Sequence, residues 1–175
     1  AGMAAGGYTP VGAIYSSFLQ RAYDQIIHDV CIQNLPVIFA IDRAGIVGRD
    51  GATHQGVFDI AYLSMMPGMV LMAPKNGPEL SAMLKTAVKI NSPTAIRYPR
   101  GTAWDGLHDR LDPVVFGKCE PLYSGSDVHI FALGSMVKIA CEVREILSES
   151  GISVAVTNAR FAKPIDSEYL SNIKE

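Results

Sequence analysis

The chain has 175 residues, of which 49% are apolar and 18% charged, and its formal net charge at pH 7 is −2. This composition excludes an intrinsically disordered chain and predicts a globular protein of one domain, or a domain and a half. The charge gives no support for a nucleic-acid partner, and no apolar run approaches the roughly 20 residues that cross a bilayer, so we expect a soluble protein. Three widely spaced cysteines without a CxxC pair predict reduced thiols and no metal site.

Apolar runs alternate with helical patterns along the first hundred residues. The runs predict short strands of a buried parallel sheet at 11–16, 36–42, 69–74 and 94–99. Helical spacing or helix-start residues predict helices at 18–34, around 58–66 and at 77–90. The first helix should bury the stripe Leu19, Tyr23, Ile26 and Val30.

The pattern lapses at 104–113, which predicts a linker or crossing segment. Beyond it, a strand at 127–134, a helix at 135–151 and a strand at 152–160 predict a βαβ unit. The helix should end at Gly151 and bury one stripe: Met136, Ile139, Ala140, Val143, Ile146 and Leu147. The predicted architecture is α/β, with a first domain at 1–103 and the start of a second at 114–175.

Polar side chains follow several predicted strands. Tyr15, Arg43 and Arg100 stand at three strand ends, and ligands of open parallel sheets bind beyond such ends. Two guanidiniums and a phenol hydroxyl suit a phosphate, because arginine stays charged and offers a planar fork of donors. The alternative is that these arginines form ordinary salt bridges with neighbouring aspartates, namely Asp42, Asp50 or Asp59.

The segment DRAGIVGRDGATHQG at 42–56 holds four glycines, two arginines, two aspartates and one histidine. His54 near Asp50 could be held for proton transfer, or it could be an ordinary hydrogen-bonded loop residue. Phe18 could pack in the core, or offer a face on which a planar heterocycle stacks. Neither GxGxxG nor GxxxxGK[ST] occurs, so no nicotinamide or Walker-type nucleotide site is supported.

The strings YSSFLQRAYDQ, DRAGIVGRDGATHQG, AIRYPRG and ARFAKPID carry a resemblance to a known family. The chain resembles the 1-deoxy-D-xylulose-5-phosphate synthases, thiamin-diphosphate-dependent members of the transketolase superfamily. The match covers nearly all of the chain and is weakest at 102–126. It implies a parallel-sheet pyrimidine-binding domain, truncated at its N-terminus, followed by a partial transketolase C-terminal domain.

The resemblance implies a reaction in which pyruvate and D-glyceraldehyde 3-phosphate condense, with loss of CO2, to 1-deoxy-D-xylulose 5-phosphate. That product is a precursor of isoprenoids, thiamin and pyridoxal. The resemblance also implies thiamin diphosphate and Mg²⁺ as cofactors, a homodimer, and a bacterial cytoplasmic or plastid stromal location. The cofactor would act as the electron sink for the carbanion that decarboxylation leaves, so the protein contributes mainly orientation and electrostatics.

Residue roles carry over by position. Phe18 resembles the residue that stacks on the aminopyrimidine ring, with Arg21 beside that ring. His54 and Asp50 resemble the polar pair around the reacting carbonyl and hydroxyl groups, and His54 is the candidate for proton handling. The phosphate of the aldehyde substrate would be held by the three strand-end residues Tyr15, Arg43 and Arg100.

Two family features do not occur in the chain: the glutamate that activates the cofactor and the GDG-type motif that holds its diphosphate and metal. We therefore expect a piece of a longer protein that is inactive by itself. Other readings stay open. They are a transketolase, the beta subunit of a 2-oxo-acid dehydrogenase, or a non-catalytic module for phosphosugar binding or subunit association.

Overall fold

The computed structural model describes residues 1–110 and 112–173. Its larger sheet has the strand order β1-β2-β4-β3-β8. The strands are β1 (Val11–Tyr15), β2 (Ile38–Asp42), β4 (Thr94–Arg97), β3 (Val70–Met72) and β8 (Phe161–Lys163). The first four are mutually parallel and β8 is antiparallel to β3. All four strands expected from the apolar runs are therefore confirmed.

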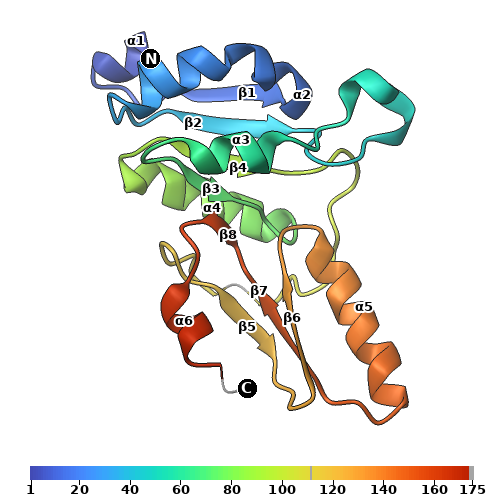
Figure 1. The fold of residues 1–175 in the computed structure, drawn as a ribbon. Coiled ribbons are helices and arrows are strands. Elements are labelled where there is room, and N and C mark those ends of the chain that lie inside the picture. Colours follow the sequence, from blue (N-terminus) through green and yellow to red (C-terminus); the bar gives the residue numbers. More distant parts are fainter. Residues whose placement is uncertain (111, 174–175) are drawn as a thin grey trace.

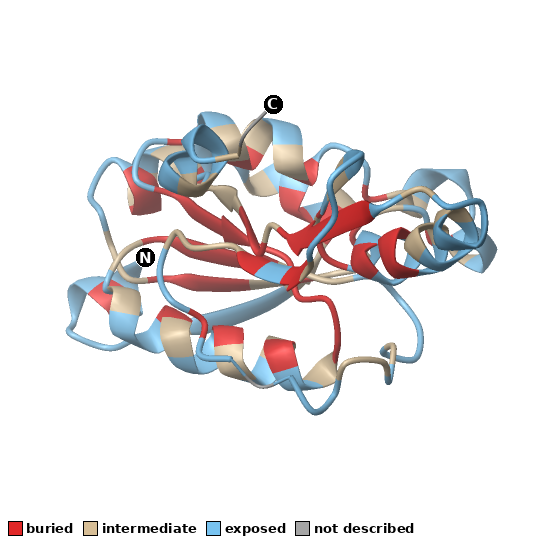
Figure 2. Ribbon diagram, turned by 90° about the horizontal axis from the view of Figure 1, so that it is seen from below, coloured by how far each residue is buried: buried red, intermediate tan, exposed pale blue. Residues whose placement is uncertain are grey.

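Helices cover both faces of this sheet (Figures 1 and 2). After α1 (Gly2–Ala5) and β1, one helical stretch is made of α2 (Ser16–Leu19), the 3-10 turn η1 (Gln20–Ala22) and the π-helix η2 (Gln25–Cys31). It packs on the same face as α3 (Asp59–Met65), and α4 (Gly77–Ile90) packs on the other. Leu19, Ile26 and Val30 are buried as expected, whereas Tyr23 is exposed.

The alternation of β2 explains this three-layer arrangement. Ile38 belongs to the core beneath α4, and Phe39 and Ile41 belong to the core on the opposite side. Successive side chains of a strand point to opposite faces, so a strand buried on both faces must be apolar at nearly every position. This is why the apolar run at 36–42 is continuous and does not alternate with polar residues.

The C-terminal part forms a second sheet with the order β5-β7-β6. Its strands are β5 (Glu120–Tyr123), β6 (Val128–Ala132) and β7 (Val154–Asn158), and its helices are α5 (Met136–Glu149) and α6 (Ser167–Ser171). β6 and β7 are parallel and joined through α5, so the βαβ unit is confirmed. Strands β5 and β8 were not expected from the sequence.

The predicted apolar stripe of α5 is right for Ala140, which is buried, and for Leu147, which packs against the same core, and it is wrong for Met136, Ile139 and Ile146. The buried residues of α5 are Val137, Ala140 and Cys141, which pack on the smaller sheet. Met136, Ile139 and Ile146 are 52%, 46% and 63% exposed. The helix has apolar side chains on two faces, and its sequence alone does not say which face meets the sheet.

The N-terminal and C-terminal parts of the chain are joined by a strand in a common sheet and by buried polar side chains. β8 follows β7 in the chain but completes the first sheet at the edge of β3. A buried polar cluster also spans the junction. Lys75 and Glu79 of the first part form ion pairs with Glu120 and Arg160 of the second, and the Asn158 amide hydrogen-bonds to Glu79. The chain beyond residue 114 is thus fixed to the first sheet by both backbone pairing and buried ion pairs.

The carboxyl ends of β1 and β2 point to one side of the molecule, where the segment between β2 and α3 extends outward (Figure 1). This segment is the charged, glycine-rich stretch of the sequence. In the described residues, no helix has both the length and the apolar character that a membrane crossing needs.

Candidate active site

An aromatic cluster stands at the carboxyl end of β1. Tyr15 is the last residue of that strand, and its ring stacks on Phe18 with centroids 5.3 Å apart and planes 8° apart. His54 approaches the same Phe18 ring edge-on at 5.2 Å. Arg21, one turn further along the helix, has its guanidinium carbon 5.8 Å from the Phe18 centroid. Phe18 stays 38% exposed, so it is not a core residue.

Arg43 turns back over this cluster. Its φ of +55° is unusual for a residue with a side chain, and such strained positions gather at functional sites. The guanidinium carbon lies 3.8 Å from the Tyr15 centroid, a cation–π contact. The Asp42 carboxylate accepts from the Arg43 backbone N–H at 2.6 Å and pairs with its guanidinium.

Asp50 joins the two arginines of the rim. Its Oδ2 accepts from Arg43 Nε and its Oδ1 from Arg100 Nη1, each at 2.9 Å. Burial works against the charge of Arg43, but the hydrogen bond to Asp50 and the nearby charge of Asp42 leave its pKa raised. Both arginines converge on a single carboxylate.

The two ends of the loop that carries Asp50 and His54 are held together at Gly45 and Gly56, which we call the neck of the loop. Gly45 and Gly56 exchange backbone hydrogen bonds of 2.7 and 2.8 Å. A Cβ on Gly56 would lie 2.3 Å from the Arg43 carbonyl oxygen and 2.6 Å from Ser16 Cβ, so no larger residue fits. The Gln55 side chain braces the loop from within, accepting from Val47 N–H at 2.8 Å and donating to a backbone carbonyl.

The structure brings all seven sequence-predicted site residues into one run of contacts. These residues are Tyr15, Phe18, Arg21, Arg43, Asp50, His54 and Arg100. The competing salt-bridge reading is also realised, because Asp42, Asp50 and Asp59 each pair with an arginine of the rim or sheet end. The roles of the seven site residues in binding and catalysis stay predictions.

Sequence reasoning assigned no role to Gln55, which shapes the loop, and none to the hydroxyl of Ser16. Ser16 Oγ is fully buried, and no residue in the described ranges hydrogen-bonds it. Its position directly after β1 was the available signal. Arg49, to which we gave no role, is exposed.

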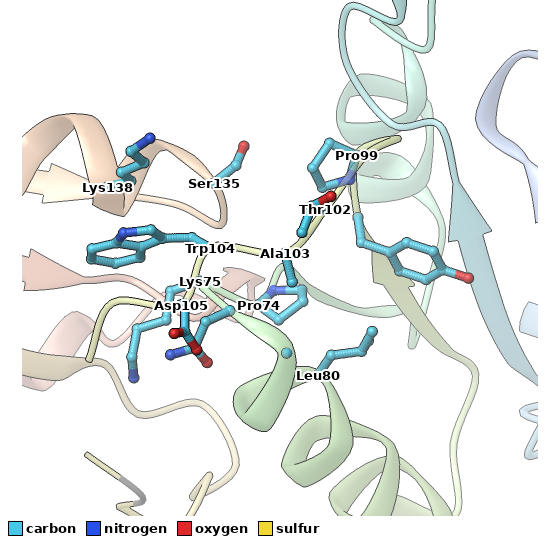
Figure 3. A pocket seen from close by; sticks show the side chains of 14 residues that line it. Pro74, Lys75, Leu80, Pro99, Thr102, Ala103, Trp104, Asp105, Ser135 and Lys138 are labelled. Carbon is cyan, nitrogen blue, oxygen red and sulfur yellow. The ribbon is translucent and has the colours of Figure 1, made fainter. Parts of the chain in front are cut away.

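A separate cavity of about 460 Å³ lies between the two parts of the chain (Figure 3). Trp104 and Ala103 cross it between Pro74 and Leu80 on one side and, on the other, Lys138 of α5 and Ser135 directly before that helix. Its lining is largely apolar and includes none of the seven site residues. We therefore place the candidate site at the arginine rim and not in this cavity.

Comparison with known proteins identifies the family. The family model "Transketolase, pyrimidine binding domain" matches residues 1–103, more than half of the chain. The chain belongs to the transketolase family. A second model, "Transketolase, C-terminal domain", matches residues 117–175 of this transketolase-family chain.

The curated relatives of this transketolase-family chain include proteins named 1-deoxy-D-xylulose-5-phosphate synthase. The one from Pelotomaculum thermopropionicum is 58% identical over 172 residues, which are 97% of this chain and 27% of that protein. The one from Lachnoclostridium phytofermentans is 52% identical over 173 residues, which are 99% of this chain and 28% of that protein. The chain thus spans little more than a quarter of these relatives, and its resemblance to them is confirmed.

Solved structures agree with the transketolase fold. One titled "Split gene transketolase, inactive beta4 tetramer" has a TM-score of 0.89 at 30% identity, over 97% of this chain and 55% of that one. A transketolase mutant from Pichia stipitis has a TM-score of 0.79 at 22% identity, over 97% of this chain and 26% of that one, which shows the fold alone.

Two groups at the site have the chemistry that the pyrimidine half of thiamin diphosphate would need. Phe18 offers an exposed aromatic ring at the rim, and Ser16 a buried hydroxyl without a partner among the described residues. The same residues do not fit Mg²⁺, since no group of three His, Cys, Asp or Glu side chains placed to hold a metal ion occurs within 1–110 and 112–173.

Proposed function

We propose that this chain is part of a synthase that condenses pyruvate with D-glyceraldehyde 3-phosphate, with loss of CO2, to 1-deoxy-D-xylulose 5-phosphate. The observation that carries the proposal is the convergence of Arg43 and Arg100 on one carboxylate beside Tyr15 and Phe18. This is a two-guanidinium anion clamp next to an aromatic stacking face. Relatives named for that activity, 52–58% identical along the chain, support it.

Arg43, Arg100 and Tyr15 would hold the phosphate of the aldehyde substrate. Both guanidiniums already present donors in hydrogen-bonding geometry to one anion. The Tyr15 ring orients Arg43 through the cation–π contact. A charge-assisted clamp of this kind fixes the distance between the phosphate and the reacting carbon, which is the main benefit of positioning.

Phe18 would stack on the aminopyrimidine ring, with Arg21 beside it. Thiamin diphosphate, when bound, would supply the electron sink for the decarboxylation of pyruvate. His54, whose ring edge meets Phe18, would accept or donate the proton at the reacting carbonyl. Asp50 on the same loop would bind substrate hydroxyls. The Thr53 hydroxyl, 2.9 Å from His54 Nδ1, orients the imidazole and leaves Nε2 for the substrate.

The diphosphate and Mg²⁺ would be held outside this chain, because the family's GDG-type motif does not occur in it and its described residues offer no group of metal ligands. We propose a homodimeric enzyme of the bacterial cytoplasm or the plastid stroma. A two-fold dimer is also the commonest state among symmetric oligomers.

Product analysis tests the activity. The intact protein, supplied with thiamin diphosphate and Mg²⁺, should form 1-deoxy-D-xylulose 5-phosphate from pyruvate and D-glyceraldehyde 3-phosphate. Transfer of a two-carbon unit from a ketose phosphate would instead identify a transketolase. Transfer of an acyl group from a 2-oxo acid would identify a dehydrogenase subunit. Phosphosugar binding without turnover would identify a non-catalytic module.

We further propose that the 175 residues alone are inactive, because the synthases they resemble are more than three times longer. The solved relative titled "inactive beta4 tetramer" comes from a split-gene transketolase, a precedent for such a part without activity. Calorimetry should show no tight, magnesium-dependent binding of thiamin diphosphate to the chain alone. Tight binding would overturn this part of the proposal.

A further inference from the structure

The anion clamp already holds an anion of the protein itself. The Asp50 carboxylate receives one donor from Arg43 and one from Arg100, on its two separate oxygens, at 2.9 Å each. The Asp50 side chain is 20% exposed and that of Arg43 19%. A phosphate seated between the two arginines would compete with Asp50 for Arg43 Nε and Arg100 Nη1, and it takes these donors only when Asp50 gives them up.

The two arginines depend on Asp50 to different degrees. Arg43 retains Asp42 as a second partner through both its backbone and its guanidinium. Arg100 is 42% exposed, and within the described residues its ion pair is with Asp50. Displacement of Asp50 therefore leaves Arg43 in place and frees the Arg100 guanidinium for a new anion.

We propose that Asp50 is an internal competitor that makes the clamp selective for phosphates over monocarboxylates, including the second substrate, pyruvate. The proposal rests on the phosphate-binding role given to Arg43 and Arg100 above. Phosphate carries about −1.5 to −2 at pH 7 and three acceptor oxygens, so it can displace a carboxylate. A free monocarboxylate offers the same group as Asp50, but Asp50 is tethered at an effective concentration on the order of millimolar or more.

The exchange also frees a group to which we assign a role in binding the substrate. Asp50 and His54 belong to the same loop, so phosphate binding frees the Asp50 carboxylate on the segment that carries the imidazole. Gly48 and Gly51 flank Arg49 and Asp50 with φ values of +62° and +80°, and the wide range of backbone conformations open to glycine would let this segment adjust when Asp50 is displaced. The neck at Gly45 and Gly56 stays closed by its backbone pair.

Binding of two probe anions to the intact protein, inorganic phosphate and acetate, tests the proposal by calorimetry. The wild type should bind phosphate and not acetate. Asp50→Asn should bind phosphate about tenfold more tightly, the value of one charge-assisted hydrogen bond, about 1.4 kcal/mol. It should also acquire acetate binding that Arg43→Ala removes. Glu149→Gln, the same carboxylate-to-amide change at the exposed end of α5, should behave as wild type.

Hydrogen exchange on the wild type gives a readout that needs no variant. Phosphate should speed exchange of the amides of Asp50 and Gly51, while those of Gly45 and Gly56 stay protected. Unchanged phosphate affinity in a folded Asp50→Asn, or no exchange response in wild type, overturns the competitor. If the wild type does not bind phosphate, or Arg43→Ala leaves its binding unchanged, the clamp itself and the proposed function fail.

Discussion

Loss of the Glu120 charge should weaken the junction between the two parts of the chain. Glu120 Oε2 accepts from Lys75 Nζ at 2.6 Å and from Asn158 Nδ2 at 3.0 Å, and its Oε1 lies 3.1 Å from Arg160 Nη2. The side chains of Lys75 and Glu120 are 1% and 3% exposed. Glu120→Gln leaves two buried cations with Glu79 as their remaining carboxylate.

Breaking one side of a buried ion pair typically costs about 3–5 kcal/mol, because the remaining charge cannot be hydrated. We expect a loss of that size in the free energy of unfolding for Glu120→Gln. Lys75→Met should cost a similar amount, and the double variant, which restores neutrality, should cost clearly less than the sum. The intact cluster is neutral because it has two cations and two carboxylates. We therefore expect a favourable coupling free energy between Lys75 and Glu120 in the double-variant cycle.

Urea unfolding followed by tryptophan fluorescence measures these losses. Trp104 is the single tryptophan and packs against the core of the C-terminal part beside the junction. Glu149→Gln serves as the matched control and should stay within about 0.5 kcal/mol of wild type. A loss below about 1 kcal/mol for Glu120→Gln, or strict additivity in the double variant, would refute the reasoning.

Three substitutions test the site, and one labelling experiment tests the Cys119 thiol. Gly56→Ala should destabilise the fold by about 1–3 kcal/mol in urea unfolding, because its Cβ would overlap Ser16; an unchanged midpoint would contradict the close approach. Arg43→Ala in the intact protein should raise the Michaelis constant for D-glyceraldehyde 3-phosphate about tenfold or more and spare that for pyruvate. His54→Ala should lower the turnover number about 100-fold or more, and unchanged turnover would remove its assigned role. Burial raises the pKa of the Cys119 thiol to about 11, so alkylation should be slow at pH 8 and accelerate until the pH passes that value; fast labelling at pH 8 would contradict this.

Much of the first domain follows from local sequence. The run VIFAID predicts a strand buried on both faces, because nearly every side chain is apolar and several are β-branched. Its polar end, Asp42 and Arg43, then had to lie at a sheet edge with the other strand ends. Chain direction in a parallel sheet was therefore enough to predict that Tyr15, Arg43 and Arg100 converge.

Tertiary structure decided what sequence patterns leave undetermined. Met136, Ile139 and Ile146 shared the helical spacing of a core stripe with Ala140. In the structure α5 buries Val137 and Cys141 beside Ala140 and leaves the other three exposed. When a helix has two apolar faces, the element that it packs against determines which face is buried. The spacing of apolar residues along the helix does not identify that element. Strand β8 was missed for the same reason: three residues gain their strand character by pairing with β3 across the junction.

The site shows the same division. Sequence offered an anion clamp and a set of salt bridges as competing readings of the same arginines. The structure realises both contacts around Asp50, because folding brings a carboxylate seven residues beyond Arg43 and fifty before Arg100 to the point where they meet. Residue types determined which groups could bind an anion. The tertiary structure of the loop determined that the carboxylate of Asp50 occupies the anion position between the two arginines.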